Sequence, residues 1–130
     1  MLTDKIYILI SGLIIGVILY QSSIVAITVF RNLDEKNTSV FLRKIFPQFF
    51  KTIIFLSSAT LILSFFSYNV IKFVVSFISI TLALTCLKII PETNKAADEK
   101  NQKRFKNLHS VSVVSTMLIL IMNTLIIFLI

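Results

Sequence analysis

Residues 6–30 read IYILISGLIIGVILYQSSIVAITVF and contain no charged side chain. A helix rises about 1.5 Å per residue, so this stretch is long enough to cross the roughly 30 Å hydrocarbon layer of a bilayer. Because backbone amides inside lipid must be bonded within the protein, apolar runs without strand-like alternation predict helices. We therefore expect an all-α integral membrane protein, in which residues 1–130 form one domain, a four-transmembrane-helix bundle. The four apolar runs predict spans at about 6–30, 47–69, 70–90 and 109–130.

The composition agrees with a membrane location. Of the 130 residues, 56% are hydrophobic and 15% charged, and the mean hydropathy is +0.92, far from the usual balance of a soluble domain. The first run ends at Arg31 and lacks the cleavage site of a secretory signal, so we expect it to be retained as a helix. We predict a multi-pass protein of the bacterial inner membrane, with membrane lipids as its partners.

Basic residues cluster in two of the segments between spans. Residues 31–51 and 91–107 carry ten Lys and Arg side chains between them, whereas the opposite side has only Lys5 and Lys72. Since Lys and Arg beside a span resist translocation, both segments are predicted to be cytoplasmic and both termini extracytoplasmic, an N-out/C-out arrangement. This bias explains the net charge of +7, which can contact anionic headgroups. No basic motif interleaved with aromatic residues points to nucleic acid.

Cap and proline signals predict helical structure in both basic loops. Ser39 can cap a short interfacial helix, and Pro47 then falls in the first turn of the second span. Pro91 is expected to end the third helix. Thr93 or Asn94 can then cap a solvated helix that runs straight into the fourth span.

The first span carries a glycine pair suited to close packing between helices. In GLIIG, Gly12 and Gly16 have the GxxxG spacing that lets two membrane helices approach closely. The other spans carry rows of Ser and Thr at spacings of three and four, which are typical of packing seams. We expect helix packing at the glycine face, and a homo-oligomer formed through it.

The only histidine lies where a charged segment gives way to the fourth span, in FKNLHSVS at residues 105–112. A polar side chain in a membrane is costly unless paired, so His109 is a candidate for ligand or proton chemistry. Hydrogen bonding at the headgroup level is the open alternative. Helical spacing places other polar residues beside it, and the predicted cluster at the cytoplasmic mouth of the bundle is Arg31, Asn94, His109, Ser112 and Thr116.

Catalytic signatures are absent from the sequence. It has no Walker loop and no GxGxxG, G-x-S-x-G or HExxH motif, and all six carboxylates lie outside the predicted spans. Cys86 and His109 alone do not make a closed metal site, which usually takes four ligands. Neither a catalytic residue nor a resident cofactor is therefore predicted.

Three stretches carry a set of motifs in a fixed order. They are FRNLDEKNTSVFLRKIFPQFFK after the first span, LKIIPETNKAADEK after the third and FKNLHSVSVVSTM at the start of the fourth. With these motifs the chain resembles the transmembrane protein 205-like family, also known as domain of unknown function 4149. The resemblance implies a four-helix membrane protein of unassigned biochemical activity. It places the family motif on Phe30, Arg31, Phe46, Pro47, Pro91, Asn94, Phe105, His109 and Ser112.

Two functional hypotheses follow. Inward polar stripes without a catalytic constellation favour a non-enzymatic membrane protein that binds or moves a small ligand or lipid, as an oligomer. The alternative is a membrane redox protein that holds haem or a metal at His109. One histidine supplies one axial ligand per chain, so a bis-His haem would need two chains.

Overall fold

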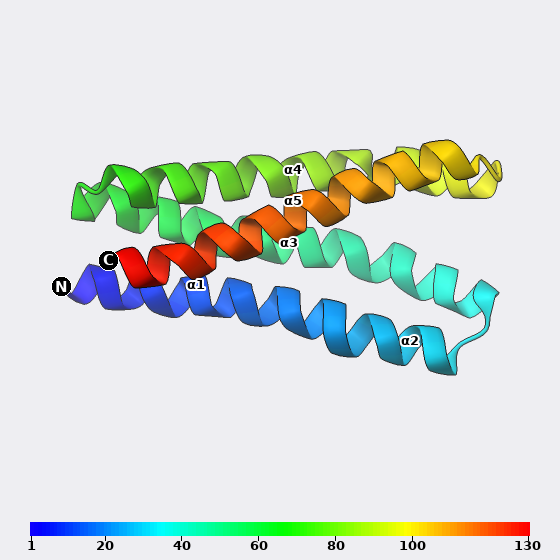
Figure 1. Ribbon diagram of the computed structural model, residues 1–130, viewed down its shortest axis with the longest axis horizontal. Helices are drawn as coiled ribbons and strands as arrows, with labels where there is room; N and C mark the ends of the chain where they lie inside the picture. The colour runs from blue at the N-terminus through cyan, green and yellow to red at the C-terminus, as the bar shows by residue number, and fades with distance from the viewer.

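The computed structural model describes residues 1–130, which form four long antiparallel helices (Figure 1). The first comprises α1 (Leu2–Tyr20), a π-helical turn η1 (Gln21–Val25) and α2 (Ala26–Asn32). The others are α3 (Glu35–Ser67), α4 (Val70–Asp98) and α5 (Gln102–Leu129). All four are long and apolar enough to cross a membrane. The chain is therefore an all-helical protein built to pass through a membrane four times.

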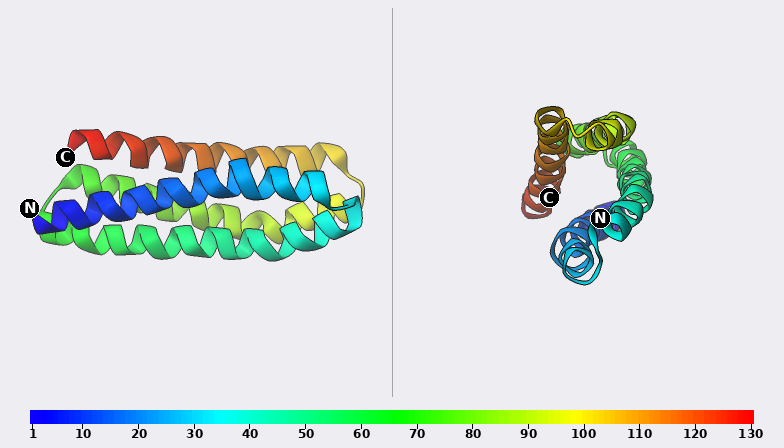
Figure 2. Two further views of the ribbon diagram at one scale, coloured as in Figure 1. Left: turned by 90° about the horizontal axis from the view of Figure 1, so that it is seen from below. Right: turned by 90° about the vertical axis from the view of Figure 1, so that its right-hand side faces the viewer.

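Each helix packs on its neighbours in an up-down bundle. The packed pairs are α1 with α3, α3 with α4, α4 with α5, and α5 with α1. Both termini and the turn between α3 and α4 lie at one end, and the other two turns lie at the opposite end (Figures 1 and 2). We call the end with the termini the outer end and the other the inner end, after the predicted sidedness, which remains a prediction.

Side chains at the turns explain where the helices begin. The Asp34 side chain accepts a hydrogen bond from the Asn37 backbone amide at 2.8 Å, and Asn69 accepts one from the Ile71 amide at 3.0 Å. Asn101 caps α5 in the same way. Short polar side chains of this kind satisfy amide groups that the first turn of a helix leaves free.

Three of the expected helix boundaries were wrong. Ser39 lies inside α3, because Asp34 caps that helix five residues earlier. Thr93 and Asn94 lie inside α4, which does not end at Pro91.

Ion pairs hold the inner end of α4 beyond its proline. Pro47 and Pro91 each remove one backbone donor, yet both helices run on through them. The inner end of α4 is tied to both neighbours, by Arg43–Asp98 to α3 and by Arg104–Glu92 to α5. The chain turns only afterwards, at Lys100, whose φ of 54° is left-handed. The helix that runs into the fourth span is therefore α5, which begins at Gln102 and not at Thr93 or Asn94.

The core lies at the middle of the bundle. Large apolar side chains such as Phe55 and Phe66 point outward, where lipid would surround them, and small polar residues such as Ser76 point inward. This distribution is typical of membrane helices, whose seams are enriched in small and polar residues. The buried apolar cluster consists of Ile14, Ile18, Phe49, Phe50, Ile53, Ala83, Cys86 and Ile119.

Candidate functional site

A cavity of about 900 Å³ occupies the inner half of the bundle. It extends from the edge of the core at Phe49 and Phe50 to the inner end, where Glu35 and Asn94 lie. Residues of η1, α2, α3, α4 and α5 line it, and about half of them are hydrophobic. We call it the inner cavity. Its volume is in the range of pockets that hold a small organic molecule.

The position of α2 accounts for this space. α1 packs on both α3 and α5, but α2, beyond the π turn, has no comparable interface with α3, α4 or α5. Figure 1 shows α2 diverging from its neighbours toward the inner end. Phe30 from α2 and Val113 from α5 both line the inner cavity.

The structure brings four of the five predicted cluster residues to one cavity. Asn94, His109, Ser112 and Thr116 all line the inner cavity, from α4 and α5. Arg31 is exposed and is not among the lining residues. The arginine that does line the cavity is Arg43, which was not among the predicted cluster residues.

His109 lies beside an aromatic ring. Its imidazole is stacked on Phe105 with ring centroids 5.8 Å apart and an interplanar angle of 4°. Both side chains are more than a third exposed and line the inner cavity. No group of three or more His, Cys, Asp or Glu side chains is arranged to hold a metal ion.

The aromatic residues of the family motif also gather at the inner cavity. Phe30, Phe46 and Phe105 line it from three helices, and Phe46 is stacked on Phe50 at 6.4 Å between centroids. Pro47 and Pro91 do not line it. The motif phenylalanines thus supply apolar surface around the polar cluster.

Charge at the inner cavity is largely neutralised. The Arg43 guanidinium donates to both Asp98 oxygens, at 3.1 and 2.5 Å. This geometry is the bidentate form of an arginine–carboxylate pair. Both residues lie outside the predicted spans, and the hydrogen bonds from Arg43 hold the pKa of the Asp98 carboxyl below its usual value. The remaining ionisable side chains in the lining are Glu35 and His109.

Gln21, which was not among the predicted site residues, lies at the deep end of the inner cavity. Its side chain is 8% exposed, and its Nε2 has no hydrogen-bond partner. Gln21 also opens the π-helical turn η1. A signal was available in the sequence: Gln21 carries the one amide side chain in the first apolar run, whose other polar side chains are all hydroxyls of Ser, Thr or Tyr.

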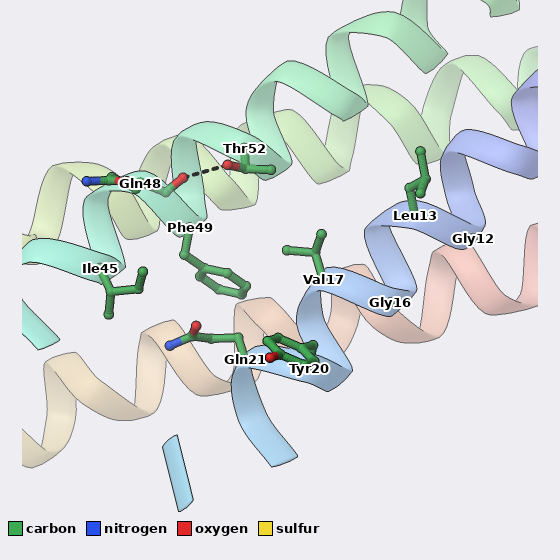
Figure 3. A pocket seen from close by; sticks show the side chains of 10 residues that line it. All are labelled: Gly12, Leu13, Gly16, Val17, Tyr20, Gln21, Ile45, Gln48, Phe49 and Thr52. Atoms are coloured by element: carbon green, nitrogen blue, oxygen red, sulfur yellow. Dashed lines mark hydrogen bonds between the residues drawn. The ribbon is translucent and has the colours of Figure 1, made fainter. Parts of the chain in front are cut away.

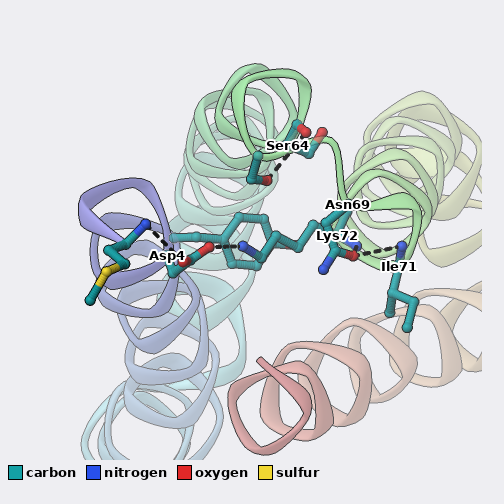
Figure 4. Close-up of polar contacts among 8 residues, drawn as sticks. Asp4, Ser64, Asn69, Ile71 and Lys72 are labelled. Carbon is teal, nitrogen blue, oxygen red and sulfur yellow. Dashed lines mark hydrogen bonds and ion pairs between the residues drawn. The ribbon is translucent and has the colours of Figure 1, made fainter.

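A second polar group, also missed, lies near the outer end (Figure 4). The Lys72 ammonium is paired with the Asp4 carboxylate, and the Lys72 side chain is only 2% exposed. The Tyr7 hydroxyl donates to the Lys72 carbonyl at 3.1 Å and lies 3.1 Å from Ser76 Oγ, which in turn donates to Thr60 Oγ1 at 2.9 Å. This outer polar cluster joins α1, α3 and α4.

Asn123 has a structural place between two helices. Its Nδ2 donates to Ser79 Oγ at 3.2 Å and to the Ile119 carbonyl at 2.9 Å. The side chain is 2% exposed, and its contact with Ser79 joins α5 to α4. The polar stripes of the third and fourth spans thus meet at this point.

Gly12 and Gly16 do not pack against another helix of the chain. A Cβ added at either position would have no neighbouring atom within 4 Å, apart from its own helix backbone. Both glycines border a groove of about 460 Å³ between α1 and α3, which Thr52 and Phe49 line from the other side (Figure 3). We call it the glycine groove. The glycine face is free in the single chain.

The fold and the inner cavity define a small four-helix membrane protein with a partly polar internal cavity. The family model described as Domain of unknown function (DUF4149) matches residues 9–102, and the chain belongs to this family. The matched region includes Gln21 and Asn94 and ends before Phe105 and His109. No curated protein and no solved structure matches the chain.

Proposed function

We propose that this protein binds a small lipid-like molecule in the inner cavity, without catalysing a reaction, and presents it or moves it within the membrane. The observation that carries the proposal is the cavity itself, about 900 Å³ in volume and lined half by hydrophobic residues and half by other types. Such a lining suits a ligand with an apolar body and a few polar atoms.

The route of entry supports a ligand that arrives from the bilayer. α2 diverges from α5 toward the inner end (Figure 1), and residues of both helices line the inner cavity. Of these lining residues, Phe30 of α2 and Met117 of α5 are also exposed, so an apolar ligand that arrives from the bilayer would meet apolar side chains. A molecule dissolved in the membrane could enter sideways without crossing water.

Three further points belong to the same proposal. We place the chain in the transmembrane protein 205-like branch of its family, in the bacterial inner membrane, with the inner cavity on the cytoplasmic side. The set of family motifs supports the placement in this branch. The excess of basic residues at the inner end supports the cytoplasmic position of the cavity. A homo-oligomer through Gly12 and Gly16 is supported by the free glycine face.

No observation favours haem or a metal at His109. The His109 ring is stacked on Phe105, and it does not belong to any group of three or more His, Cys, Asp or Glu side chains that could hold a metal ion.

Two neighbouring valines give a matched test. Val113 lines the inner cavity, whereas Val114 does not and is 57% exposed. We propose native mass spectrometry of wild type, Val113→Trp and Val114→Trp, each extracted from its own membranes in mild detergent. We expect a copurifying molecule on wild type and Val114→Trp, and at least about a threefold lower occupancy on Val113→Trp, because the indole takes up ligand space. Equal occupancy on both variants, or none on wild type, would contradict the proposal.

A further inference from the structure

We infer that Gln21 recognises the ligand of the inner cavity by donating a hydrogen bond to an uncharged carbonyl oxygen on an otherwise apolar molecule. The inference rests on the proposed function and deepens it, since it names the chemical class of the ligand and the residue that selects it.

The first observation is a buried donor with nothing to bind. Gln21 is 8% exposed and its Nε2 has no partner within the protein. A buried polar group without a hydrogen bond destabilises the fold, so most such groups in native proteins are paired. Gln21 borders the inner cavity and the glycine groove, and Figure 3 shows its amide lying across from Ile45 and Phe49. A ligand oxygen in the inner cavity can complete this unmade bond.

The second observation is that the lining threonines have their own partners. Thr38, Thr93 and Thr116 donate to the backbone carbonyls of Leu33, Ile89 and Ser112, at 3.3, 2.8 and 2.7 Å. Among the lining residues, Gln21 is therefore the side chain that is more than nine-tenths buried and still has a free donor.

The third observation is the backbone around Gln21. It opens the π-helical turn η1, in which the Ala26 amide bonds to the Gln21 carbonyl five residues earlier. Turns of this kind inside long helices are rare and are frequent at functional sites. The turn also marks where α1 gives way to α2, whose residues Ala26 and Phe30 line the inner cavity.

The charged side chains that line the inner cavity favour a ligand with an uncharged oxygen over an anionic one. The one permanently charged basic side chain in the lining is Arg43, and its guanidinium already donates two hydrogen bonds to Asp98. Glu35 adds a carboxylate at the inner end of the lining. An anionic head group would find no free guanidinium or ammonium here and would be repelled by Glu35. A ketone, quinone or ester carbonyl accepts from an amide without needing a counter-ion.

The test uses probes with and without a carbonyl. The probes are a decyl-substituted benzoquinone, dioctanoylglycerol and pentadecane, and the variants are Gln21→Met and the control Gln48→Met. Gln48 borders the glycine groove but not the inner cavity. We expect Gln21→Met to weaken the better-bound carbonyl probe about three- to tenfold, which is the range of one net hydrogen bond. Binding of pentadecane should not fall, and Gln48→Met should match wild type.

An infrared spectrum reads the hydrogen bond directly. The carbonyl stretch of the bound probe should lie at lower frequency on wild type and Gln48→Met than on Gln21→Met. Should Gln21→Met fail to fold, Gln21→Asn keeps an amide one methylene further back and should weaken the same probe. Whichever carbonyl probe binds more tightly shows whether the natural oxygen belongs to a quinone-like ring or to a glycerolipid ester.

The outcomes separate this inference from the proposed function. If pentadecane binds as well as the carbonyl probes, and only Val113→Trp reduces binding, the cavity function stands and the role of Gln21 is overturned. The same holds if Gln21→Met changes neither affinity nor carbonyl frequency. If neither carbonyl probe binds wild type, the inference is overturned whatever the copurified sample contains.

Discussion

The Lys72 ammonium at the start of α4 is paired with the Asp4 carboxylate at the start of α1, 68 residues earlier in the chain. Lys72 is 2% exposed, and its ammonium also lies 5.5 Å from the centroid of the Tyr7 ring. A buried ammonium is costly without a partner, so Asp4 satisfies a charge that the fold has taken out of water. The pair joins the outer end of α4 to the outer end of α1.

Removing Asp4 should therefore destabilise the bundle more than an exposed carboxylate would. Asp4→Asn is expected to lower the free energy of unfolding, because it leaves the Lys72 ammonium buried and without a carboxylate partner. The loss should be smaller than for a fully buried pair, since the Asp4 side chain is 40% exposed. The measurement is unfolding by denaturing detergent in mixed micelles.

The double variant tells whether the pair or the charge matters. Asp4→Asn combined with Lys72→Met should recover most of the lost stability, since an apolar side chain replaces the unpaired ammonium. Lys5→Met, at an exposed position beside Asp4, is the control and should change little. If the double variant lost as much free energy of unfolding as Asp4→Asn and Lys72→Met lose when added together, the pairing would be contradicted.

Asn123 is expected to stabilise the contact between α4 and α5. Asn123→Ala should lower the free energy of unfolding by about 0.6–1.7 kcal/mol, the range of hydrogen bonds between membrane helices. Ser79→Ala should add little on top, because both substitutions remove the same Nδ2–Oγ bond. Thr124→Val is the control, since that hydroxyl bonds only to its own helix at Leu120. Additive losses from Asn123 and Ser79 would show that the bond does not couple them.

The sequence predicted the four helices because runs of about 20 apolar residues admit few alternatives in a membrane. It located the ends of α3 and α4 poorly. Proline lowers helix stability locally, and the ion pairs that hold the inner end of α4 join residues such as Arg43 and Asp98, which are 55 positions apart. Such partners become visible only when the helices are packed.

Only part of the candidate site could be predicted, for a similar reason. Helical spacing alone put His109, Ser112 and Thr116 on one face, and all three line the inner cavity. Gln21 and Lys72 stand singly in or beside apolar runs, and a single residue gives no period from which its direction can be read. The burial of each depends on how its helix is rotated against its neighbours.

The free glycine face predicts association between copies of the chain. Gly12→Leu and Gly16→Leu should each reduce crosslinked dimers in membranes several-fold, because a leucine side chain holds the partner helix away. The single chain should fold as before, since no atom lies within 4 Å of either added Cβ. Leu9→Phe, which changes an exposed lipid-facing side chain, is the control. Crosslinking that both glycine variants leave unchanged would show that the glycine face is not the interface.

Sidedness can be tested with two turn residues. Tyr68 lies in the turn between α3 and α4 and Lys100 in the turn between α4 and α5, and both are exposed. In a Cys86→Ala background, Tyr68→Cys in intact cells should react with a membrane-impermeant thiol reagent, whereas Lys100→Cys should react only after the membrane is opened. The physical reason is the excess of Lys and Arg at the inner end, which resists translocation. The background itself should not react, and wild type should react little because Cys86 is buried. The reverse pattern would place the inner cavity on the outer side of the membrane and would leave the helix packing unchanged.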